Sequence, residues 1–209
     1  MAINATNESK PKELIPAGNY IARCYQMIEI GTITEIVMGV ERTLKKVRIG
    51  WELPTELKVF KEENGEQPLV ISKEFTLSMH EKSNLRLALK SWRGKDFTED
   101  EAKKFDITKL IGVPCMLNII HNPSKNDASK VYEQISGITP LPKGVPCPEQ
   151  INQNIIISFD DFDLDKFNKL PDFIKDKIKS SKEYKELQNP NHVESSGKIE
   201  TLSDDDLPF

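Results

Sequence analysis

The 209-residue sequence has no long hydrophobic run: no apolar stretch approaches the roughly 20 residues that a transmembrane helix needs. Its first residues also lack the basic-then-apolar pattern of a secretory signal peptide. These two absences argue against a helical membrane protein and against secretion. We therefore expect a cytoplasmic protein with no membrane partner.

Cysteine and histidine are also scarce. A structural zinc site needs clustered ligands, such as paired CxxC motifs, and no such spacing occurs. We therefore predict reduced thiols, no disulfide framework, and no metal or other cofactor. The residues concerned are Cys24, Cys115, Cys147, His80, His121 and His192.

Motifs that carry catalysis are missing as well: there is no GxxxxGK[ST], no GxGxxG after a strand, no GxSxG and no HExxH. The densest carboxylate group is DDFDLD, residues 160–165, which lacks the glycine and the distal glutamate of a calcium loop. We interpret it as a solvated turn or a helix start, and we predict that the protein is not an enzyme. The alternative is a metal-dependent nuclease that uses Asp160 and Asp161.

The charge of the chain is unevenly distributed, with a formal net charge of −4. Residues 1–140 hold 20 basic and 19 acidic side chains, a net charge of +1, whereas residues 141–209 hold 9 and 14, a net charge of −5. Asymmetry of this kind often marks an acidic tail. The overall negative charge therefore does not exclude a nucleic-acid-binding body.

Alternating apolar residues predict five strands. In the second, Val47, Ile49, Trp51 and Leu53 share one parity and Arg48 lies on the other, which predicts a half-buried strand with a basic outer face and Trp51 in the core. A bulge at Gly31 would let the first strand continue into residues 32–39. The five strands are predicted at residues 18–31, 41–54, 69–79, 113–120 and 131–138.

The apolar period changes to that of a helix between the third and fourth strands. SMHE, residues 78–81, has the spacing of a capping box and would open a helix over residues 81–92 that ends at Gly94. TEDE, residues 98–101, would open a second, short helix that ends near Gly112. Five strands with a helix between the third and fourth are typical of the OB-fold, a partly open barrel that binds oligonucleotides.

We therefore predict a mainly β chain with helical additions. A flexible N-terminal arm covers residues 1–16, and a five-stranded OB-fold barrel that binds single-stranded DNA covers residues 17–142. A C-terminal extension covers residues 143–190, with a linker or surface crossing at its start, a short strand in 154–162 and an amphipathic helix over 165–187. A disordered acidic tail, residues 191–209, completes the chain.

Binding of single-stranded nucleic acid requires cations for phosphates and aromatic rings for unstacked bases. The predicted phosphate contacts are Arg23, Arg42, Lys45, Lys46, Arg48, Lys73, Arg93, Lys125 and Lys130. The predicted stacking residues are Tyr25, Phe75, Trp92 and Tyr132. Two alternatives stay open: the cations of the second strand are only its solvated face, and Trp92 belongs to the core.

The chain ends in Asp204, Asp205, Asp206, Leu207, Pro208 and Phe209. This hexapeptide resembles the acidic C-terminal tip of bacterial single-stranded-DNA-binding proteins, a run of aspartates followed by an aliphatic residue, Pro and Phe. The stretches SMHEKSNLRLALKSWRGKDFT and IGVPCMLNIIHN also resemble phage replication proteins. The resemblance implies sequence-independent binding and protection of single-stranded DNA in the host cytoplasm. It also implies that replication, recombination and repair proteins grip Phe209 in a basic-rimmed apolar pocket while the aspartates engage the rim.

The chain departs from the bacterial pattern by its larger helical insert and by the helix before the tail. We therefore expect a monomer or a homodimer rather than the bacterial tetramer. Two other functions stay open: a recombination mediator or annealing protein, and an adaptor or DNA mimic that binds host factors and no DNA.

Overall fold

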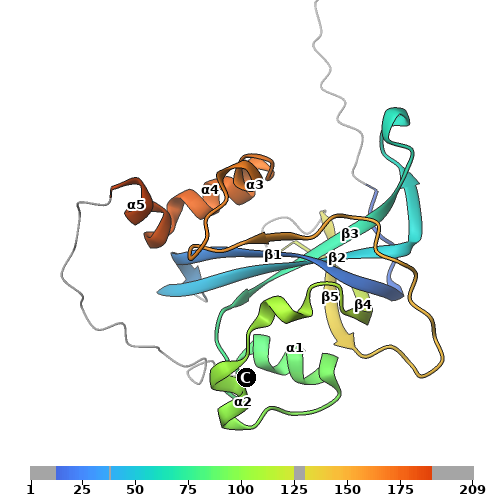
Figure 1. Ribbon diagram of the computed structural model, residues 1–209, viewed down its shortest axis with the longest axis horizontal. Helices are drawn as coiled ribbons and strands as arrows, with labels where there is room; N and C mark the ends of the chain where they lie inside the picture. Colours follow the sequence, from blue (N-terminus) through green and yellow to red (C-terminus); the bar gives the residue numbers. More distant parts are fainter. Residues whose placement is uncertain (1–12, 38, 125–129, 190–209) are drawn as a thin grey trace, which may run out of the picture.

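The computed structural model describes residues 13–37, 39–124 and 130–189 (Figure 1). The strands are β1 Gly18–Val37, β2 Val40–Val59, β3 Glu66–Thr76, β4 Pro114–Pro123, β5 Val131–Thr139 and β6 Ile155–Ile157. The helices are α1 Asn84–Arg93, α2 Glu99–Lys104, α3 Leu164–Asn168, α4 Asp172–Ser180 and α5 Lys182–Gln188, with 3₁₀ turns η1 Glu62–Asn64 and η2 Ile107–Leu110. Within these ranges no helix is long and apolar enough to span a bilayer.

The strands form one sheet, which confirms the predicted mainly β class, and the short strand predicted within 154–162 is its sixth strand, β6. The hydrogen-bonded order is β3-β2-β1-β4-β5, and β6 pairs in parallel with β1. β1 bonds to β4 through residues 18–23 and to β6 through residues 26–28, so β6 takes over the edge of β1 where β4 has ended. In the described residues no ladder joins β3 to β5, and the sheet is not a closed barrel.

The main core lies between the inner face of the sheet and the α1–α2 segment, which Figure 1 shows on the side opposite α3, α4 and α5. Val47, Ile49, Trp51 and Leu53 are all buried in it, as their shared parity predicts. Trp92 of α1 packs against Trp51, with 5.9 Å between the ring centroids. The α1–α2 insert therefore closes one side of the sheet.

A second core covers the outer face of β1. Ile28 and Ile30 of β1 pack there with Ile174 and Ile178 of α4, and all four side chains are buried. The predicted bulge at Gly31 is confirmed by a register shift between Glu29 and Gly31. Gly31 has φ +89°, and a Cβ on it would lie 2.8 Å from atoms of Glu183, Phe159 and Ser181. A glycine is needed here because the C-terminal helices approach the strand too closely for a side chain.

Three predictions about helix ends are wrong, one of them the end of α2 near Gly112: α2 stops at Lys104, and the separate 3₁₀ turn η2 follows it. Helix α1 begins after Ser83, whose Oγ accepts from the backbone N of Arg86 at 3.2 Å, and not at the SMHE stretch. The predicted helix over residues 165–187 is three helices. Leu170 precedes a proline, which disfavours helical backbone, and the Ser181 hydroxyl accepts from the backbone N of Tyr184 and starts α5 anew. The predicted capping box of α2 is confirmed: Thr98 and Glu101 bond each other's backbone N–H.

Burial should make the three cysteines differ in reactivity. Cys24 and Cys115 are fully buried, and burial raises the pKa of Cys24 to about 12 and raises that of Cys115 as well. Cys147 is only partly covered. Because the thiolate is the reactive species, Ellman's reagent at pH 8 should modify one thiol rapidly in the native protein and three in guanidinium.

The Cys147→Ser variant should lose the rapid phase of this reaction. Two rapid thiols in the native wild type would mean that the ladder between β1 and β4, which buries Cys24 and Cys115, opens in solution.

Candidate nucleic-acid interface

The outer faces of β2 and β3 meet α4 in a group of four side chains, which we call the Arg48 cluster: Arg48, Glu74, Phe173 and Lys177. Glu74 accepts from Arg48 Nη1 at 2.9 Å and from Lys177 Nζ at 2.6 Å. The Arg48 guanidinium carbon lies 5.3 Å from the centroid of the Phe173 ring. Burial raises the pKa of Glu74, but the Lys177 hydrogen bond and the two cations outweigh burial and hold that pKa below its ordinary value.

The other predicted cations of β2 do not form a uniformly basic face. Lys45 pairs with Glu29 at 2.7 Å, and Lys46 pairs with Glu35. Arg42 is half-buried and has no ion pair within the described ranges. The carboxylates that neutralise Lys45 and Lys46 come from the neighbouring strand β1, where Glu29 is in register with Val47 and Glu35 with Arg42.

Lys45 also lies on a different face from Lys46 and Arg48, because successive strand residues point to opposite faces. Together with Glu29 it lines a hollow of about 520 Å³ between β1, β2, β6 and the α2–η2 segment, with Met27 and Val47 among the other lining residues. Phosphates on the outer face would therefore meet Arg42, Lys46 and Arg48, but not Lys45.

Arg23 and Lys73 were also predicted as phosphate contacts, but their side chains instead hold parts of the fold together by hydrogen bonds. Arg23 donates from Nη1 to the carbonyl of Gly112 at 2.7 Å and from Nη2 to that of Pro148 at 2.8 Å. Lys73 donates to the carbonyl of Ile135 at 2.9 Å, and burial lowers its pKa. Arg23 thus holds the 140–150 segment against β1, and Lys73 joins the facing edges of β3 and β5.

The predicted stacking residues divide into buried and exposed rings. Phe75 and Trp92 are wrong as stacking residues, since they are 3% and 4% exposed. Phe75 shares its parity with the buried Ile71, and Trp92 donates its indole N–H to the carbonyl of Pro114 at 3.1 Å. Tyr25 is half-buried, and burial, with a smaller effect from Glu52, raises its pKa to about 12.

The remaining predicted residues lie on separate elements. Tyr132 is 42% exposed on β5, and Lys130 is exposed just before that strand. Arg93 lies at the end of α1. Its guanidinium carbon is 4.2 Å from the Phe97 ring centroid, and its Nη2 is 3.4 Å from Glu101 Oε1. Lys125 and the predicted tip of Asp204, Asp205, Asp206, Leu207, Pro208 and Phe209 lie outside the described residues.

Sequence reasoning missed two functional features. Glu52 is fully buried and accepts hydrogen bonds from the backbone N of Ile151 and of Asn152 and from the Asn152 amide, at 2.7–2.8 Å. It therefore anchors the chain that leads into β6. Phe173 lies in the segment predicted as an amphipathic helix, without a role of its own, and is 56% exposed. The signal was in the spacing: Ile174 and Ile178 form one i,i+4 stripe, and Phe173 and Lys177 form the next.

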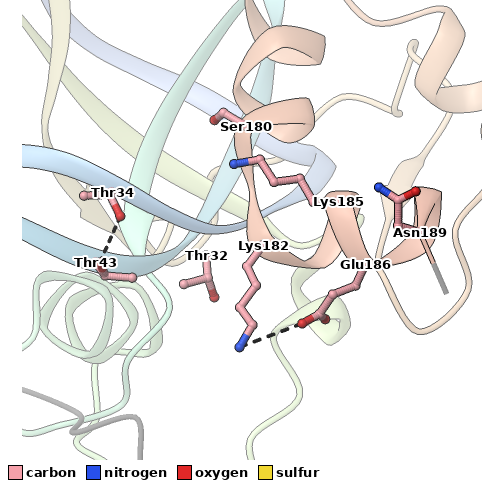
Figure 2. A pocket seen from close by; sticks show the side chains of 8 residues that line it. All are labelled: Thr32, Thr34, Thr43, Ser180, Lys182, Lys185, Glu186 and Asn189. Carbon is pink, nitrogen blue, oxygen red and sulfur yellow. Dashed lines mark hydrogen bonds and ion pairs between the residues drawn. The ribbon is translucent and has the colours of Figure 1, made fainter. Parts of the chain in front are cut away.

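A polar groove of about 750 Å³ lies between the end of the β1–β2 hairpin and α5, as Figure 2 shows. Thr34 and Thr43 share a hydrogen bond of 2.9 Å across the hairpin, and Lys182 lies 3.8 Å from Glu186. The lining residues are Thr32, Thr34, Thr43, Ser180, Lys182, Lys185, Glu186 and Asn189. The described lining residues offer hydroxyl and ammonium donors to the groove.

The described residues contain no group of three His, Cys, Asp or Glu side chains that could hold a metal ion. In DDFDLD, Asp163 accepts from the backbone N of Lys166 at 2.9 Å and caps α3. The chain matches no family model, no curated protein and no solved structure.

Proposed function

We propose that the chain is an OB-fold protein that binds and protects single-stranded DNA without sequence preference in DNA replication and recombination, including those of a phage. The strand order β3-β2-β1-β4-β5 with α1 between β3 and β4 is the observation that carries this proposal. It agrees with a partly open five-stranded barrel, in which Lys73 bridges the two facing edges. The protein acts by sequestration rather than by catalysis.

The strand of DNA would cross the outer faces of β2 and β3 between the β1–β2 and β4–β5 hairpins. Phosphates would replace the carboxylate partners of Lys46 and Arg48. Both ion pairs are partly buried, so each phosphate must take over its cation as the carboxylate leaves, because breaking a buried pair without a replacement costs about 3–5 kcal/mol. Each exchanged contact releases counterions, and affinity should therefore fall steeply as salt rises.

The acidic tip would recruit replication and repair proteins and compete with DNA for the same cations. Fluorescence anisotropy of a labelled dT oligonucleotide at two salt concentrations tests this, with the full chain and with a chain that ends at Thr201. We expect salt-sensitive binding that is tighter without the tip. Absence of binding by both chains would disprove the proposal, and equal or weaker binding on truncation would disprove the competition.

The pairing of Lys45, Lys46 and Arg48 with carboxylates favours a second candidate, an adaptor that binds proteins through the tip and no DNA. The adaptor would capture replication proteins in a tip-dependent manner and leave the dT anisotropy unchanged. A strand-annealing assay separates simple protection from the pairing of complementary strands, which a recombination mediator would accelerate.

A further inference from the structure

We infer that α4 completes the nucleic-acid site and that the ring of Phe173 is a stacking surface for an unstacked nucleobase. This inference rests on the proposed function and deepens it. It assigns a binding role to the C-terminal extension, and it places a base directly over the strand pair that carries Arg48 and Glu74.

Exposure separates Phe173 from the residues that hold α4 in place. Its ring is 56% exposed, whereas its neighbour Ile174 is 4% exposed and Ile178 is fully buried. These isoleucines anchor α4 on β1 through the second core. The phenyl ring is therefore not needed to dock the helix, and it stands on a rigid element with much of its surface free.

The surroundings of Phe173 suit a nucleotide better than a purely apolar ligand. The Arg48 guanidinium lies 5.3 Å from the ring centroid, within the range of a cation–π contact, and fixes the ring beside β2. Lys177 lies one helical turn further along α4, and its ammonium is 2.6 Å from Glu74. An aromatic face flanked by cations is the combination that binds single strands, because bases stack on the ring while phosphates meet the charges.

Phe173 also differs from the stacking residues predicted from the sequence, because its exposed ring lies beside Arg48 of β2. Phe75 is buried in the main core, and Tyr132 lies on β5, three ladders away from β2. Arg48 and Glu74 are direct partners across the β2–β3 ladder. The contact with Arg48 therefore places an exposed aromatic ring, that of Phe173, beside the outer face of that ladder.

The test is dT-oligonucleotide anisotropy with the full chain and the variants Phe173→Ala, Phe173→Trp and Leu187→Ala. Leu187 is a matched control, since it is an exposed apolar side chain of α5, 48% accessible. Loss of a stacking ring costs about 1–3 kcal/mol, so Phe173→Ala should weaken binding about 5- to 150-fold. Phe173→Trp should bind like the wild type, and Leu187→Ala should change nothing.

Salt dependence and fluorescence separate stacking from other effects. Phe173→Ala should leave the salt slope unchanged because no phosphate contact is removed, whereas Lys177→Gln should reduce it. The indole added by Phe173→Trp should be quenched on DNA addition, which provides a readout even where the alanine variant fails to fold. The inference would be overturned if the wild type binds DNA, Phe173→Ala binds equally well, and the fluorescence of Phe173→Trp is not quenched. Absence of wild-type binding would overturn the proposed function instead.

Discussion

Replacing Trp92 with alanine should lower the free energy of unfolding by about 3–5 kcal/mol, the cost of removing a buried tryptophan. The side chain is 4% exposed, packs against Trp51, and holds α1 against the start of β4 through its hydrogen bond to Pro114. Its loss would leave a cavity between α1 and the sheet. Urea unfolding followed by circular dichroism measures the change.

The two tryptophans provide a matched comparison. The Trp51 indole N–H is buried and has no hydrogen-bond partner in the described part of the chain, whereas that of Trp92 is bonded. Trp92→Phe breaks a hydrogen bond, and Trp51→Phe removes an unpaired donor. Trp92→Phe should therefore cost about 1–3 kcal/mol more than Trp51→Phe. If Trp92→Ala were as stable as the wild type but bound dT more weakly, Trp92 would be a stacking residue after all.

The pattern of the sheet could be predicted because it is local. In β2 the alternation of Val47, Ile49 and Trp51 with charged residues reports directly which face is buried, since a strand repeats every two residues. The bulge at Gly31 was equally visible. β6 is different: the sequence predicts a short strand within 154–162, but it cannot show the pairing with β1, because that partner lies some 130 residues earlier in the chain.

The C-terminal helices show how local signals compete. Apolar residues recur at helical spacing across 165–187, and that periodicity predicts one helix. Pro171 and Ser181 carry the opposite information, and in the structure they separate three short helices. The shorter pieces follow the surface of β1 more closely than one straight helix would, and each places its own apolar residues in the second core.

The candidate site could be predicted only in part, because its character depends on distant residues. The parity of β2 correctly places Arg48 on the outer face. It cannot show that Lys177, 103 residues after Glu74, approaches the same carboxylate, or that Phe173 stacks on the guanidinium. Phe75 failed as a stacking residue because the face of β3 was misassigned, and a one-residue error in parity exchanges the two faces of a strand.

Replacing Ile178 with alanine should detach α3, α4 and α5 from the sheet while the main core stays folded. Ile178 is fully buried in the second core, which shares no residue with the main core. An isoleucine-to-alanine change in a core costs about 2–5 kcal/mol. Tryptic cleavage at the lysines of α4 and α5 should therefore accelerate about 30-fold or more, at tenfold per 1.4 kcal/mol.

Leu187→Ala is the control for this experiment because its side chain is exposed. The unfolding transition reported by the fluorescence of Trp51 and Trp92 should be unchanged in Ile178→Ala, since both indoles lie in the main core. A loss of global stability equal to the local loss would instead show that the sheet and the C-terminal helices unfold as one cooperative unit.

The same variant connects packing with function. If Phe173 and Lys177 bind DNA only because α4 is docked, Ile178→Ala should weaken dT binding at least as much as Phe173→Ala does, although Ile178 itself is inaccessible to DNA. In the double variant the two losses should not add, because the second substitution removes a contact that the first has already abolished. Additive losses would mean that Phe173 still contacts DNA in Ile178→Ala, which would contradict the requirement for a docked α4.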